Sequence, residues 1–154
     1  TFLFVGGGSR WETIRDSAEK AGLSNVVLHG YVAKEQTPSV MQSAHCALIT
    51  MRDEMLGVVS PSKLHSNLAM GLPVAYIGPA KSNVDDAIAA YDCGRSLRHG
   101  QADELINYIR ELRQDEATYQ ASRQRARHAF EQRYCDDHAL TEFDKVLSDL
   151  HQGN

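Results

Sequence analysis

Short apolar runs alternate with segments of helical periodicity along the first hundred residues of this chain, and this alternation limits the folds open to it. Four of these runs are predicted strands, Phe2–Val5, Val26–His29, Cys46–Thr50 and Val74–Ile77, and Gly94–Leu97 is predicted to be a short strand or an extended segment. Strands that are apolar throughout, rather than on alternate residues, are typical of parallel sheets buried between helices. The sequence therefore predicts an α/β fold: a parallel sheet with helices on both faces.

Helical periodicity and capping residues predict the elements between and after the strands. We expect Ser9 to cap the first helix and Gly22 to end it. Beyond Asp103 the spacing of apolar residues predicts C-terminal helices that pack on the domain. The predicted helices are Ser9–Ala21, Thr37–Ala44, one opening at Ser60, Asn83–Tyr91, one from Asp103, a charged one through about Tyr134, and Asp137–Leu150.

Length and composition restrict the class of protein. A chain of 154 residues is predicted to be one domain, and a net charge of −4 argues against a general nucleic-acid binder. Three cysteines without a CxxC pair predict neither a disulfide framework nor a zinc site, and favour a reducing compartment. The histidines show no metal-ligand spacing. Because Thr1 leads straight into a strand, we expect a piece cut from a longer protein.

Ligands of parallel α/β sheets bind beyond the carboxyl ends of the strands. This rule points to three loops, Gly6–Arg10, Gly30–Val32 and Met51–Lys63. The glycine run is a weak dinucleotide fingerprint, because Trp11 stands where a third glycine is expected and no acidic residue follows the second strand. Two interpretations stay open for Gly6, Gly7 and Gly8: a turn that brings backbone close to a ligand, or a tight turn only.

Lys63 is the most informative residue of the third loop. Ser60 is predicted to cap the helix and Pro61 suits its first turn. A cation there opposes the helix dipole at a cost of about 0.3–1 kcal/mol. Lys63 could extend into solvent or pair with Asp53 or Glu54. Alternatively, Lys63, Ser62 and the helix N–H groups could hold an anion such as phosphate. The residues alone leave both open.

Other charged groups carry weaker signals. The adjacent carboxylates at 53–54, 85–86 and 136–137 are predicted to be solvated or capping, since neighbours in sequence diverge. A lone histidine such as His65 favours a structural role. The run Arg123, Arg125, Arg127 is predicted to form a solvated helix face. No catalytic triad can be placed from spacing.

Four stretches carry a resemblance that covers almost the whole chain: FLFVGGGS, NVVLHGYV, SPSKLHSNLAMGLPVAYIG and CGRSLRHGQADELINYIREL. In this order and spacing the sequence resembles the carboxy-terminal, donor-binding half of family 4-type (group 1) glycosyltransferases of the GT-B fold. The resemblance implies that residues 1–154 are a single Rossmann-like nucleotide-sugar-binding domain of a two-domain, hexosyltransferase-type enzyme of glycan or polysaccharide biosynthesis.

The resemblance also implies a donor site for a UDP- or GDP-sugar, with no further cofactor and no metal. The backbone at Tyr31 and Val32 would lie against the base, and Gly6–Gly8 would line the cleft. The helix start at Ser60 and Pro61, with Ser62, Lys63 and Leu64, would face the diphosphate. Lys63 would serve catalysis, because helix N–H groups and cations stabilise the leaving diphosphate in this fold.

Two departures keep alternatives open. The family usually has glutamates at the positions of Ser66 and Val58, and the first of these binds the ribose; Ser66 could still donate one hydrogen bond. The acceptor domain would precede Thr1, so we expect the isolated chain to be inactive. The full-length protein is expected in the cytoplasm, with peripheral association at the inner face of the membrane left open. The alternatives are a GT-B nucleotide-sugar epimerase and a degenerate, non-catalytic binding or scaffold module.

Overall fold

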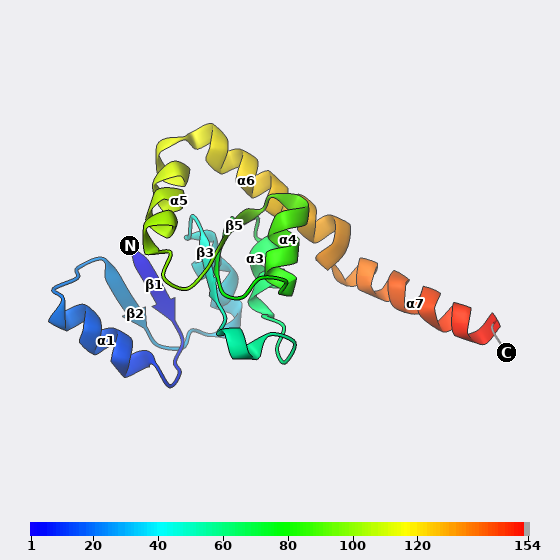
Figure 1. Cartoon of the computed structure of the whole chain (residues 1–154), viewed down its shortest axis with the longest axis horizontal. Coiled ribbons are helices and arrows are strands. Elements are labelled where there is room, and N and C mark those ends of the chain that lie inside the picture. The colour runs from blue at the N-terminus through cyan, green and yellow to red at the C-terminus, as the bar shows by residue number, and fades with distance from the viewer. Residues whose placement is uncertain (153–154) are drawn as a thin grey trace. The chain divides into compact units, whose positions relative to one another are not determined.

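The computed structural model describes residues 1–152, which fall into two compact units, Thr1–Val40 and the chain from Met41 onward. Figure 1 shows the elements of each. The strands are parallel in both units, as predicted. Whether the units together form one domain stays a prediction.

Unit 1 is a two-stranded parallel sheet with one helix. β1 (Phe2–Val5) pairs with β2 (Val26–His29), and α1 (Trp11–Lys20) connects them. A short 3-10 turn, Lys34–Gln36, follows. Both strands have the predicted bounds. Ser9 does not cap α1, because the N-cap is Arg10 and no side chain accepts a bond from the first turn.

Unit 2 contains a three-stranded parallel sheet in the order β3-β4-β5. Ala47 lies opposite Val74, which lies opposite Gly94. The helix α2 (Thr37–Gln42) spans the boundary between the units. The remaining elements are β3 (Ala47–Thr50), a 3-10 turn (Asp53–Met55), α3 (Lys63–Ala69), β4 (Val74–Ile77), α4 (Asn83–Tyr91), β5 (Gly94–Leu97), α5 (Ala102–Gln114), α6 (Glu116–Ala129), a π turn (Phe130–Tyr134) and α7 (Asp136–Gln152).

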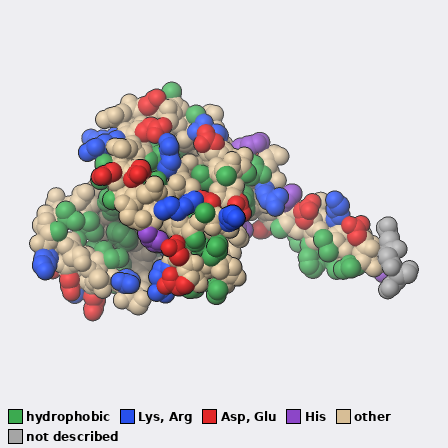
Figure 2. All heavy atoms as spheres, viewed as in Figure 1, with side chains coloured by type: hydrophobic (Ala, Val, Ile, Leu, Met, Phe, Trp, Pro, Cys, Tyr) green, Lys and Arg blue, Asp and Glu red, His purple; other side chains and the backbone are tan. Residues whose placement is uncertain are grey.

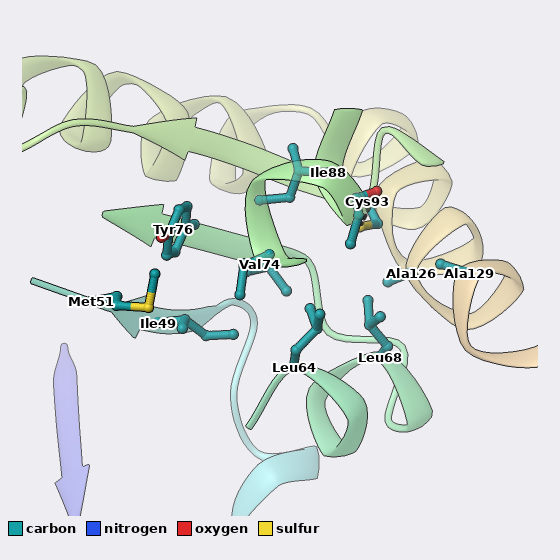
Figure 3. Packing of buried hydrophobic residues seen from close by; sticks show 12 residues of the cluster. Ile49, Met51, Leu64, Leu68, Val74, Tyr76, Ile88, Cys93, Ala126 and Ala129 are labelled. Carbon is teal, nitrogen blue, oxygen red and sulfur yellow. Dashed lines mark hydrogen bonds between the residues drawn. The ribbon is translucent and has the colours of Figure 1, made fainter. Parts of the chain in front are cut away.

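Two apolar clusters hold helices against this sheet. In the larger one, side chains of α3, α4 and α6 pack with those of β3 and β4 (Figure 3). Leu64 and Leu68 of α3 are 1% and 0% exposed there. A smaller cluster joins Ala75 of β4 to Tyr108 and Leu112 of α5 and Tyr119 of α6. Because successive β4 residues point to opposite faces, helices cover both faces of the sheet, as predicted.

The C-terminal helices divide into two kinds. α5 and α6 pack on unit 2, as predicted, whereas α7 leaves its apolar side chains exposed. Within residues 1–152, no helix combines the length and apolar character needed to cross a membrane.

Candidate functional site

The N-terminal cap of α3 is not the one predicted from the sequence. The helix begins at Lys63, its N-cap is Ser62, and no side chain caps it. The Ser60 hydroxyl instead accepts a hydrogen bond from Asn83 Nδ2 at 2.9 Å. The Leu64 N–H donates to the Pro61 carbonyl at 3.0 Å. The predicted Ser60 cap is therefore wrong: the helix begins only at Lys63, and the Ser60 hydroxyl accepts a hydrogen bond from a residue of α4 instead of from the first turn.

Lys63 is exposed and is the first residue of α3. Its side chain has no ion-pair or hydrogen-bond partner among residues 1–152. Glu54 pairs with Arg52 at 3.6 Å, and Asp53 lies 3.8 Å from His99. The alternative in which Lys63 pairs with the preceding loop is wrong. A free cation thus stands at the positive end of α3, where an added anion would relieve the repulsion.

Free backbone N–H groups at the start of α3 also favour an anion. The N–H groups of Ser62 and Lys63 find no acceptor in the described part of the chain. Free N–H groups at a helix start favour anions for the same reason that the dipole does. Lys63 and its neighbours therefore form an exposed, positively polarised corner of unit 2.

The two positions where carboxylates are expected carry no acid. The Ser66 hydroxyl donates to the Lys63 carbonyl at 3.2 Å, so its proton is already used within α3. Val58 is 72% exposed. The His65 ring meets the edge of Tyr134 at 5.5 Å between centroids, in agreement with the predicted structural role.

Arginines of α6 bind the opposite end of α3. Arg127 Nη1 donates to the Ala69 carbonyl at 2.7 Å, and Arg123 Nε donates to the Gly71 carbonyl at 3.3 Å. Arg125 Nε similarly reaches the Asp92 carbonyl at the end of α4, at 2.8 Å. Guanidinium groups satisfy free carbonyls there and complement the negative end of the dipole. The prediction of a solvated face therefore holds only in part: Arg125 and Arg127 are 38% and 51% exposed, and the three arginines also cap two helices.

Replacing Arg127 tests the strength of this cap. Arg127→Ala removes a charge-assisted hydrogen bond, and because the side chain is about half exposed we expect a loss of about 1–2 kcal/mol in the free energy of unfolding. Urea unfolding followed by circular dichroism measures the loss. Arg110→Ala on α5, where the structure of residues 1–152 shows no partner, is the control. Equal stability of the two variants would contradict the capping role.

A polar network missed at the sequence level joins the loops that follow β4 and β5. Asp85 of α4 accepts hydrogen bonds from the Ser96 hydroxyl, from Arg98 Nη2 at 2.9 Å and from the Lys81 N–H at 2.8 Å. Arg98 also donates to the Gly78 carbonyl at 3.3 Å. Burial alone would raise the pKa of Asp85, but these donors outweigh it and hold the pKa below its ordinary value.

The lowered pKa of Asp85 sets the sign of a pH effect. A carboxylate with a depressed folded-state pKa contributes stability above its unfolded pKa, about 3.9, and loses it as the pH falls through the folded value. At pH 7 we expect Asp85→Asn to cost about 1–3 kcal/mol. The gap between wild type and variant should close below about pH 4. Thermal unfolding from pH 7 to 2.5 measures this, and a gap independent of pH would contradict it.

In unit 1 the structure brings the glycine turn and Tyr31 together. Gly6 and Gly8 have φ of +116° and +149°, which side chains rarely adopt. A Cβ on Gly7 would lie 3.0 Å from the Tyr31 ring, which is itself 84% exposed. Val32 is half-buried. An open hollow of about 540 Å³ lies beside the turn, lined by Gly6, Gly7, Gly8, Ser9, Trp11, Glu12 and Gly30.

The predicted site residues thus fall into two groups. Gly6–Gly8, Tyr31 and Val32 belong to unit 1, and Ser60–Leu64 with Ser66 belong to unit 2. Within residues 1–152 no three His, Cys, Asp or Glu side chains are grouped to hold a metal ion. Metal independence stays a prediction.

Comparisons with known proteins place this geometry in context. The family model of glycosyl transferases group 1 matches residues 1–129. A crystal structure of WaaG, a glycosyltransferase involved in lipopolysaccharide biosynthesis, superimposes with a TM-score of 0.65 and 24% identity. The match covers 92% of this chain and 36% of that one, so the chain spans about a third of its solved neighbour. No curated protein matches.

Proposed function

The chain belongs to the group 1 glycosyl transferase family, and from this premise we propose that it is the donor-binding half of an enzyme that transfers a sugar from a nucleoside-diphosphate sugar to an acceptor. The observation that carries the proposal is the free cation of Lys63 at the start of α3, within the matched residues. The fold agrees, since its parallel strands and flanking helices are those of a GT-B glycosyltransferase.

The proposed role of Lys63 follows from charge. When the bond between the sugar and the diphosphate breaks, negative charge develops on the departing diphosphate. The Lys63 ammonium and the N–H groups of Ser62 and Lys63 can offset that charge without moving. The Leu64 N–H is already bonded to the Pro61 carbonyl and is therefore not free for the diphosphate. Leu64 contributes its buried side chain, which holds the helix in place.

The remaining proposed contacts with the donor come from Tyr31 and Gly6–Gly8 in unit 1 and from Ser66 in unit 2. Tyr31 offers an exposed aromatic ring, and Gly6–Gly8 leave backbone accessible beside it. We propose a uridine or guanosine diphosphate sugar as the donor, no metal, and an acceptor bound by polypeptide that precedes Thr1. For Ser66 to bond a ribose hydroxyl as donor, it must first release the Lys63 carbonyl.

Hydrogen exchange of the full-length enzyme tests the proposal. Saturating UDP or GDP should slow amide exchange in peptides covering Ser60–Ser66 and Gly30–Val32, because bound phosphate and base shield their N–H groups. A peptide within α5 serves as the control and should be unchanged. Unchanged exchange at Ser60–Ser66 with both nucleotides would contradict the donor-site assignment.

Product analysis separates the alternatives. A transferase releases nucleoside diphosphate in step with a glycosylated acceptor, whereas an epimerase returns a nucleotide sugar of changed configuration. The missing carboxylates at Ser66 and Val58 also suit a non-catalytic module, which would bind the donor and form neither product.

A further inference from the structure

One side of α3 is held by an aromatic residue of the π turn. The Tyr134 ring meets the His65 ring with 5.5 Å between the centroids and 63° between the planes, so the two rings lie edge to face. His65 follows Lys63 by two positions in α3. Tyr134 is half-buried and packs against the larger apolar cluster. The contact therefore links the helix that carries Lys63 to the core of unit 2.

Neighbouring rings hold Tyr134 in its place. Its ring also meets that of Tyr91, the last residue of α4, at 6.4 Å between centroids and 69° between planes. Tyr91 in turn meets His128 of α6 at 6.3 Å. Edge-to-face pairs of this kind stabilise beyond the apolar area that they bury. Tyr134 thus contacts α3 from a position that α4 and α6 help to fix.

The π turn determines the direction in which Tyr134 points. α6 ends at Ala129, and Phe130–Tyr134 continue it with π geometry. A π turn contains one residue more than an α-helical turn, and each residue of a helix rotates the next side chain by about 100°. An uninterrupted α-helix would therefore aim the side chain of residue 134 about 100° away from its present direction. Single π turns are frequent at functional sites.

The contact between His65 and Tyr134 restricts rotation of α3 about its own axis. Leu64 and Leu68 are four residues apart, so they lie in one line along the helix and hold it against the core without preventing such rotation. His65 lies about 100° around the axis from Leu64, and Lys63 lies about 100° from it in the other direction. A rotation of about 10° would move an atom about 6 Å from the axis by about 1 Å.

We propose that Tyr134 is a positioning residue for sugar transfer: its ring contact with His65 sets the rotation of α3 and thereby the place of the Lys63 ammonium. The inference rests on the proposed function, because it takes Lys63 as the group that offsets charge on the departing diphosphate. A displacement of about 1 Å can cost about a hundredfold in rate. The backbone N–H groups lie closer to the helix axis than the ammonium, so the same rotation moves them less.

Substitutions of Tyr134 in the full-length enzyme test the proposal. Tyr134→Ala removes the ring and should lower kcat by about tenfold or more. Tyr134→Phe keeps the ring and should stay within about twofold of wild type. Leu105→Ala on α5 is the matched control, because it truncates a partly buried side chain of the smaller cluster, whose members all lie outside α3. Its kcat should be unchanged. Steady-state kinetics measure kcat at a temperature at which circular dichroism shows every variant folded.

A double substitution separates the proposed route from one through the next helix. α7 begins at Asp136, and Figure 2 shows hydrophobic side chains gathered along one side of it. Tyr134→Ala could therefore also lower kcat by redirecting α7. If Tyr134 acts through Lys63, adding Tyr134→Ala to Lys63→Ala should cost less than about twofold further, because the group that it positions is already absent. A full additional loss would overturn the proposal.

The remaining outcomes distinguish the positioning role from the donor site. If Lys63→Ala loses activity while Tyr134→Ala keeps it, the positioning role is wrong and the proposed function stands. Loss of activity in Tyr134→Phe, or an equal loss in Leu105→Ala, would also overturn the positioning role. Full activity of Lys63→Ala would reject the catalytic role of Lys63 and this inference with it.

Discussion

Gly94→Ala should prevent unit 2 from folding. A Cβ at this position would lie 2.0 Å from the Val74 carbonyl oxygen and 2.8 Å from its carbonyl carbon. Both are backbone atoms of β4, the central strand, and Val74 is 0% exposed. Since neither strand can retreat without breaking the sheet, we expect a loss of more than about 4 kcal/mol, at the extreme of single substitutions. Circular dichroism and soluble yield measure the effect.

Gly30→Ala is the matched control for this variant. A Cβ there meets no atom within 4 Å, and its φ lies outside the left-handed region. We expect its stability to stay within about 0.5 kcal/mol of wild type. A folded Gly94→Ala protein of near-normal stability would show that β4 and β5 do not approach as closely as described.

Lys63→Ala in the full-length enzyme should lower kcat by about a hundredfold or more, the usual effect of removing one group that stabilises developing charge. Because Lys63 is exposed and unpaired among residues 1–152, the free energy of unfolding should change by less than about 0.5 kcal/mol. Steady-state kinetics with the donor sugar and urea unfolding measure the two quantities.

Lys20→Ala at the end of α1 controls for loss of positive charge, and its kcat should be unchanged. If Lys63→Ala retains full activity, the proposed catalytic role is wrong. If it loses activity together with several kcal/mol of stability, Lys63 serves the fold instead.

Local sequence patterns predicted most of the fold because the helices and strands are short and because glycine, proline and capping residues mark their ends. Val74–Ile77 and Asn83–Tyr91 have the predicted bounds, with Gly71 and Pro73 before the strand and Ser82 capping the helix. The family resemblance, which depends on the order of several motifs, is confirmed by the match over residues 1–129.

What the sequence missed depends on residues far apart in the chain. Ser60 looked like a cap, but its hydroxyl binds Asn83, 23 positions later. The α6 arginines showed only a charge pattern, and their acceptors are backbone carbonyls that carry no sequence signal. Asp85 meets Arg98 only because β4 and β5 are neighbours. The signal at Lys63 could be found in the sequence because its conflict with the helix dipole is local; the structure leaves Lys63 exposed at the start of α3, and its role stays a prediction.

The arginine caps on α3 also mean that this helix can be completed only after α6 has been synthesised. Arg127 and Arg123 lie 58 and 52 positions after the carbonyls that they bind. At a synthesis rate of about 5–20 residues per second, the ribosome needs about 3–12 s to reach Arg127 after Ala69 is made. During that interval the helix that begins at Lys63 has an open carboxyl end, so a nascent chain that stops before α6 should leave α3 frayed.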